Sequence, residues 1–148
     1  MVDADLSDTA ERLTRRRSRL LPVLAVFYVG QQVSFFSRGN SVATVDHFKI
    51  GAWAVMSAAL LILLVTGGFW LRKPELRAML NDEGTRAHRA DALGTGFVVA
   101  MITGIIVYVI NSGSQMTSRE VIHLIVSLGI AAALVRFGFL ERRAHQLV

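Results

Sequence analysis

The chain has 148 residues, a formal net charge of +5, 53% hydrophobic residues and a mean hydropathy of +0.47. This apolar content exceeds that of ordinary soluble domains. Because there is no cysteine, the composition excludes disulfides, thiolate nucleophiles, CxxCH haem attachment and cysteine-based zinc sites. We expect the positive charge to face anionic lipid headgroups rather than to bind nucleic acid directly.

Four long apolar runs dominate the chain, each about as long as a helix that crosses the hydrocarbon core of a bilayer. Backbone groups in lipid must be hydrogen-bonded internally, and the runs lack the alternation of barrel strands. A soluble helical bundle is disfavoured because the runs have no polar face. The sequence therefore predicts an all-α integral membrane four-helix bundle. The predicted spans are residues 20–37, 50–71, 93–110 and 121–140.

Basic residues are unevenly distributed between these runs. The N-terminal segment, the connector after the second run and the C-terminal tail are rich in arginine, whereas the other two connections carry few basic residues. The positive-inside rule then predicts that both termini and the middle connector lie in the cytoplasm. We divide the chain into a basic cytoplasmic segment, residues 1–19, and a transmembrane domain, residues 20–148. A cleaved signal peptide is the disfavoured alternative for the first run.

The middle connector is the most organised polar segment. Pro74 suits the first turn of a short helix, and Asp82 can cap a second one. We expect this second helix to continue without a break through Arg86 and Arg89 into the third run, with its charged residues on an outer face.

Polar residues inside the apolar runs are candidates for function. Gln31 and Gln32 lie in the first run and Arg136 in the fourth. They could form an intramembrane polar site or pathway. The simpler interpretation is that the glutamines join helices and that Arg136 extends to the headgroups.

The histidines predict neither a metal site nor a cofactor. The expected topology puts His47 and His123 near one membrane surface and His88 and His145 near the other, so the four cannot form one tetrahedral site. A haem between the first pair is a minor alternative to histidines hydrated at the interface. No acidic residue lies inside a predicted span, and we expect no enzymatic activity.

Small residues recur at four-residue spacing and let helix backbones approach closely. Gly96, Ala100 and Gly104 form one such stripe in the third run, and Gly129 and Ala133 form another in the fourth. We expect these stripes to form contacts between helices within the bundle. Alternatively, one stripe could form the contact between two copies in a homodimer.

The stretch Leu80-Asn81-Asp82-Glu83-Gly84-Thr85-Arg86, together with the span layout, resembles small uncharacterised bacterial four-span proteins with an N-D-E-x-T-R segment before their third helix. It is more distantly similar to D-E-R-T families of unknown function, whose genes often stand beside helix-turn-helix regulators. The resemblance implies location in the bacterial inner membrane and a regulatory pairing with a DNA-binding protein.

We therefore expect a membrane-embedded regulatory protein that docks a cytosolic partner through the connector before the third span. A small oligomeric channel or transporter is one alternative, and an accessory subunit of a larger membrane complex is another. In a further alternative, the connector is merely solvated and lies on the lipid headgroups, without binding a partner. The expected docking residues are Asp82, Glu83, Arg86, His88 and Arg89.

Overall fold

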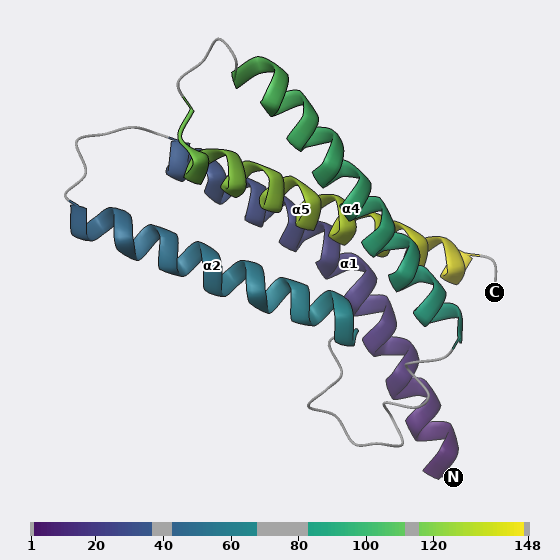
Figure 1. Cartoon of the computed structure of the whole chain (residues 1–148). Helices are drawn as coiled ribbons and strands as arrows, with labels where there is room; N and C mark the ends of the chain where they lie inside the picture. The colour runs from purple at the N-terminus through teal and green to yellow at the C-terminus, as the bar shows by residue number, and fades with distance from the viewer. Residues whose placement is uncertain (1, 37–42, 68–82, 112–115, 147–148) are drawn as a thin grey trace.

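The computed structural model describes residues 2–36, 43–67, 83–111 and 116–146, and every regular element among them is a helix. The prediction of an all-α chain is therefore confirmed. Figure 1 shows the last helix crossing the first and the third obliquely, with the second helix at one side. The four helices are α1 (Val2–Phe36), α2 (Ala43–Thr66), α4 (Glu83–Asn111) and α5 (Ser118–Gln146).

Helix α5 is the central element, because it contacts each of the other three helices. Small residues on α5 make this central position possible, because they let the backbones of the neighbouring helices approach closely. Helices α1 and α4 pack most extensively against it, whereas α2 is attached more lightly (Figure 1). The arrangement thus differs from a square bundle, in which each helix would share its contacts between two neighbours.

Helices α4 and α5 approach most closely at two glycines. A Cβ atom on Gly96 would lie 2.6 Å from the carbonyl oxygen of Gly129 and 2.9 Å from the Cβ of Ala133. A Cβ atom on Gly129 would lie 3.1 Å from the Cβ of Ala100. The predicted small-residue stripes of the third and fourth runs therefore face each other across this contact, within the chain.

Helices α1 and α5 approach closely at Pro22. A Cβ atom on Gly138 would lie 2.9 Å from Cδ of this proline, so the pyrrolidine ring occupies the space that a larger residue would fill. Leu21, Ala25 and Tyr28 follow at helical spacing and are buried on the same side of α1. Proline is tolerated inside membrane helices when neighbouring groups satisfy the backbone that it leaves unbonded.

Helix α2 buries Ser57, Leu60 and Leu64 and exposes most of its other side chains. It ends at Thr66, before the predicted limit of residue 71. Gly67 adopts a positive φ of 73°, the left-handed conformation that commonly terminates helices and that glycine adopts without steric cost. Gly67, which lies inside the predicted run of residues 50–71, was a sequence signal for this boundary.

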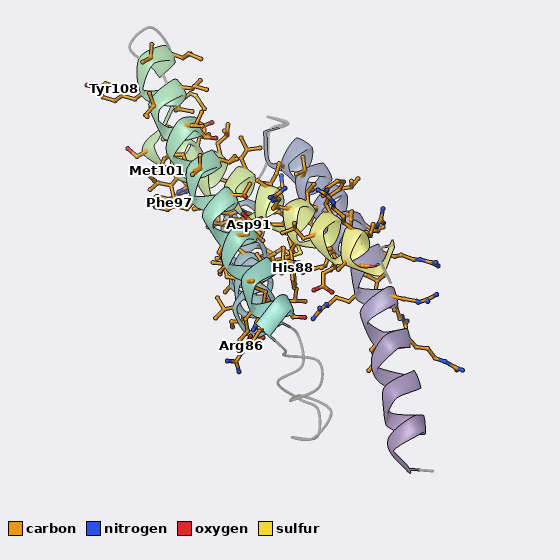
Figure 2. The ribbon with its side chains drawn as sticks, turned by 90° about the vertical axis from the view of Figure 1, so that its right-hand side faces the viewer. Arg86, His88, Asp91, Phe97, Met101 and Tyr108 are labelled. Atoms are coloured by element: carbon orange, nitrogen blue, oxygen red, sulfur yellow. The ribbon has the colours of Figure 1, made fainter. Side chains whose placement is uncertain are left out.

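Three helices of the described chain are long and apolar enough to cross a membrane: Phe48–Thr66, Glu83–Ile110 and Ser118–Ala144. The prediction of helices long and apolar enough to span a membrane is confirmed for these three, and α1 is not among them. Exposed apolar side chains cover the outer surface of α4, and Figure 2 shows Phe97, Met101 and Tyr108 directed away from the other helices. Such a surface suits contact with lipid rather than with water.

Candidate functional site

Polar side chains gather at the two ends of the helical assembly. We call the end that contains Arg17 and Glu141 the basic end, and the end that contains Gln32 and His123 the pocket end. Because consecutive helices run in opposite directions, the first half of α1, the end of α2, the start of α4 and the end of α5 all meet at the basic end (Figure 1).

A buried ion pair joins α1 to α5 at the basic end. Arg17 donates a 2.5 Å hydrogen bond to the carboxylate of Glu141, whose side chain is only 3% exposed. The guanidinium carbon of Arg17 also lies 5.0 Å from the ring centroid of Phe137, a distance suited to a cation–π contact. Glu141 follows directly after the fourth predicted span, and nothing in the local sequence marked it as buried.

Two arginines bind the end of α2. Arg17 donates a 3.2 Å hydrogen bond to the carbonyl of Gly67, and Arg89 donates a 2.9 Å hydrogen bond to the carbonyl of Val65. The last carbonyls of a helix have no partner within the helix, and basic side chains are favourable there. His88 lies beside the same group, with Nδ1 3.9 Å from a carboxylate oxygen of Glu141. This cluster therefore holds all four helices together.

The residues predicted to dock a partner divide into two groups. His88 and Arg89 are half-buried and directed into the cluster just described, whereas Glu83 and Arg86 are exposed. Figure 2 shows Arg86 at the start of α4, pointing away from the other helices. Asp82 and the short helix expected from Pro74 lie outside the described residues. Helix α4 begins at Glu83 and continues to Asn111, which confirms the prediction of an unbroken helix through Arg86 and Arg89 into the third span.

The exposed surface of the basic end is rich in arginine. Several of these side chains lie on the first half of α1, and the remainder lie on α4 and α5. Glu83 is an acidic residue among them. The exposed arginines are Arg12, Arg15, Arg16, Arg19, Arg86, Arg142 and Arg143.

Arg136 forms an ion pair with α4. Its Nε donates a 2.8 Å hydrogen bond to a carboxylate oxygen of Asp91, and an Nη atom lies 2.8 Å from the same oxygen. The interpretation of Arg136 as a residue that merely extends to the headgroups is therefore incomplete, because its guanidinium is fixed on Asp91. Arg136 lies thirteen positions after His123 on α5, about 20 Å along the helix axis. The predicted polar set of Gln31, Gln32 and Arg136 does not come together in one place.

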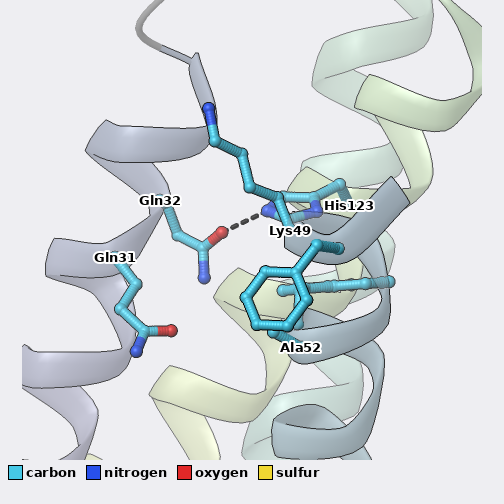
Figure 3. A pocket seen from close by; sticks show the side chains of 7 residues that line it. Gln31, Gln32, Lys49, Ala52 and His123 are labelled. Atoms are coloured by element: carbon cyan, nitrogen blue, oxygen red, sulfur yellow. Dashed lines mark hydrogen bonds between the residues drawn. The ribbon is translucent and has the colours of Figure 1, made fainter. Parts of the chain in front are cut away.

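At the pocket end, Gln32 bridges α1 to α5. Its carboxamide oxygen is bonded to Nε2 of His123, and its Nε2 donates a 2.9 Å hydrogen bond to the carbonyl of Tyr28 (Figure 3). The second bond fixes which end of the carboxamide faces the imidazole, so Nε2 of His123 is the donor. This geometry agrees with the interpretation of Gln32 as a residue that joins helices.

His123 is 2% exposed and stacks on Trp53, with ring centroids 4.4 Å apart and an interplanar angle of 27°. Trp53 in turn donates a 3.1 Å hydrogen bond to the hydroxyl of Ser127. The expectation of a hydrated interfacial histidine is therefore wrong for His123. The ring of Trp53 thus joins α2 to α5.

Two further polar contacts hold the pocket end. The hydroxyls of Tyr28 and Ser57 lie 2.6 Å apart and link α1 to α2. Glu120 accepts a 2.8 Å hydrogen bond from the backbone N–H of Thr117, and its own N–H lies 3.4 Å from the Thr117 hydroxyl. This reciprocal pattern is a capping box, and the spacing Thr-x-x-Glu was a sequence signal for it.

A pocket of about 260 Å³ opens between α1, α2 and α5 at this end. Figure 3 shows Gln31 and Gln32 on one wall, Lys49 and Ala52 on the opposite wall and His123 behind them. Gln31 is exposed, in contrast to its neighbour Gln32. The pocket is lined by Gln31, Gln32, Phe48, Lys49, Ala52, Trp53 and His123.

Within the described residues, no group of three or more His, Asp or Glu side chains lies close enough to hold a metal ion. The side chain of His47, the proposed haem partner of His123, lies outside the described side chains. No family model, no curated protein and no solved structure matches the chain.

Proposed function

We propose that this protein is a non-enzymatic, four-span protein of the bacterial inner membrane that binds a cytosolic partner at its basic end. In this proposal, α1 supplies the fourth span beside the three helices that meet the length and hydropathy of a membrane span. Exposed apolar side chains on α1 support that assignment. They are Leu20, Val23, Val26, Phe27 and Val29.

The observation that carries the proposal is the length of α1. The helix has 35 residues, whereas about 20 suffice to cross a bilayer. Its N-terminal part, before the contacts of Arg17, extends beyond the other helices as a rod of regular backbone (Figure 1). A helix that only had to enter the membrane would not need this extension, and a projecting helix is a ready surface for another protein.

The charge of this surface defines the partner that it fits. After an acidic start with Asp3, Asp5, Asp8 and Glu11, four exposed arginines lie between residues 12 and 19, and Arg86 at the start of α4 adds to them. Complementary charge increases association rates and fixes orientation. We therefore propose a cytosolic protein with an acidic face, and the helix-turn-helix regulator implied by the sequence resemblance is the first candidate to test.

The contacts of the predicted docking residues refine the proposal. His88 and Arg89 face the cluster around Glu141, so we assign them to the internal structure of the basic end. Glu83, Arg86 and the arginines of α1 form the proposed docking surface. Asp82 stays a predicted member of that surface.

Site-specific photocrosslinking in the native host tests the proposal. A photoreactive residue at position 16 or 86 is expected to give a discrete protein adduct, which disappears when Arg12 and Arg19 are replaced by glutamate. Position 119 at the opposite end, where Arg119 is also exposed, is the matched control and should give no such adduct. Crosslinks only to lipid at positions 16 and 86 would contradict the proposal.

A further inference from the structure

The pocket end contains a cavity that the proposed docking function does not use. Its volume of about 260 Å³ is slightly below the range of typical small-molecule sites, about 300–1,000 Å³. The cavity lies where α2 is only lightly attached to the other helices, so space remains between α1 and α2 beside the stacked pair of Trp53 and His123.

Three of the seven lining side chains, those of Gln32, Trp53 and His123, are held in place without a ligand. Gln32 is bonded to His123 and to the carbonyl of Tyr28, and Trp53 is bonded to Ser127. Binding would not have to order these side chains, and a preorganised site avoids that entropic cost.

The charge of the lining favours an anion. Lys49 is the cation among the seven lining residues, and none of the seven is acidic. Glu120, which is at the same end of α5, accepts hydrogen bonds from Thr117 in the cap of that helix. The carboxamide of Gln31 lies on the wall opposite Ala52 and supplies a further hydrogen-bond donor (Figure 3).

The remaining lining is apolar and aromatic. Phe48 and Trp53 both border the cavity, and the side chain of Phe48 is largely exposed. Aromatic surfaces of this kind bind the apolar part of a ligand, whereas a few polar groups fix its orientation. A cation on one wall, a carboxamide on the other and aromatic rings between them suit a molecule with an anionic head and an apolar body.

We propose that this cavity binds a small acid with an apolar body, with its anionic group at Lys49 and Gln31 and its apolar part against Phe48 and Trp53. Two sources can supply this chemistry: a free organic acid, such as an arylacetate, or an anionic lipid whose headgroup enters the cavity from the membrane surface. The same lining serves either molecule.

The test uses 4-fluorophenylacetate as the probe, followed by fluorine NMR on the full chain in nanodiscs of phosphatidylcholine. We expect saturable binding that Lys49→Gln weakens roughly tenfold or more, the size expected for loss of a charge-assisted hydrogen bond. Lys49→Arg should retain binding, which separates loss of charge from loss of structure. Arg119→Gln, at the same end but outside the lining, should leave the affinity unchanged.

The neutral probe 4-fluorophenylacetamide is the matched control for charge. Equal binding of acid and amide, unchanged by Lys49→Gln, would overturn the proposal, as would the absence of saturable binding. Nanodiscs that contain phosphatidylglycerol distinguish the two sources. Displacement of the probe by this lipid would assign the site to an anionic lipid, and undiminished binding would assign it to a free acid; both results support an anion site.

Discussion

Arg142 donates a 3.1 Å hydrogen bond from Nε to the backbone carbonyl of Ser18. In a regular helix this carbonyl would accept the N–H of residue 22, four positions further along, but Pro22 has no N–H to give. An arginine from α5 thus satisfies the acceptor that a proline in α1 leaves without its helical partner. Pro22 also packs against Gly138. The same residue therefore allows α1 to approach α5 closely and leaves the Ser18 carbonyl in need of the hydrogen bond from Arg142.

This relationship predicts coupling between the two positions. Arg142→Gln should destabilise the protein by about 1–3 kcal/mol, the cost of leaving a buried carbonyl without its partner. In a Pro22→Ala background the helix can form its own bond to Ser18, and the same substitution should cost less. A double-mutant cycle by denaturant titration in detergent measures the difference. Equal costs in the two backgrounds would show that the bond does not compensate for the proline.

The buried pair of Arg17 and Glu141 predicts a larger effect. Glu141→Leu leaves the guanidinium without its carboxylate in a largely buried place, and we expect a loss of roughly 3–5 kcal/mol of stability. The double replacement Arg17→Met with Glu141→Leu removes both charges and should recover much of this loss. Thermal unfolding of the three proteins in the same detergent provides the comparison. A double variant less stable than Glu141→Leu alone would contradict this explanation.

The contact between α4 and α5 predicts opposite outcomes for two glycines of the same helix. Gly96→Ala places a Cβ 2.6 Å from a backbone oxygen of α5, and we expect a destabilisation of about 1–3 kcal/mol. A Cβ atom on Gly94 would have no neighbour within 4 Å, so Gly94→Ala should be neutral or slightly stabilising. Unfolding midpoints of the two variants, measured side by side, check the prediction. Equal midpoints would place the helix contact elsewhere.

Adjacent glutamines on α1 also form a matched pair. Gln32→Leu removes the bond to His123 and should cost about 0.6–2 kcal/mol, as for other hydrogen bonds between membrane helices. Gln31→Leu changes an exposed residue and should leave stability unchanged. Denaturant titration of both variants tests the assignment, which fails if Gln31→Leu is the more destabilising change.

Local sequence patterns predicted some of these features because they are periodic or short-range. The apolar runs predicted an all-α chain, and the four-residue spacing of Gly96 with Ala100 and of Gly129 with Ala133 predicted the tight helix contact that the structure contains. The continuity of α4 from Glu83 was predicted from the helix cap expected at Asp82. Two available signals were missed, namely the glycine that ends α2 and the capping box at Thr117.

The remaining features depend on contacts between distant residues. Arg17 and Glu141 are 124 positions apart, and only the packing of α1 against α5 brings them together. Arg136 and Asp91 meet in the same way across α4 and α5, so the local sequence could show that Arg136 was unusual but not what it binds. His123 looked like a surface histidine because its partners, Gln32 and Trp53, come from two other helices.

The most direct test of the account concerns the orientation of the basic end, and the chain suits it because it has no cysteine. Single cysteines at positions 16 and 143 mark the basic end, and one at position 119 marks the pocket end; all three replace exposed arginines. Whole cells treated with a membrane-impermeant maleimide should label position 119 at once and positions 16 and 143 only after permeabilisation. Labelling of positions 16 and 143 in intact cells, with position 119 protected, would contradict a cytosolic docking surface.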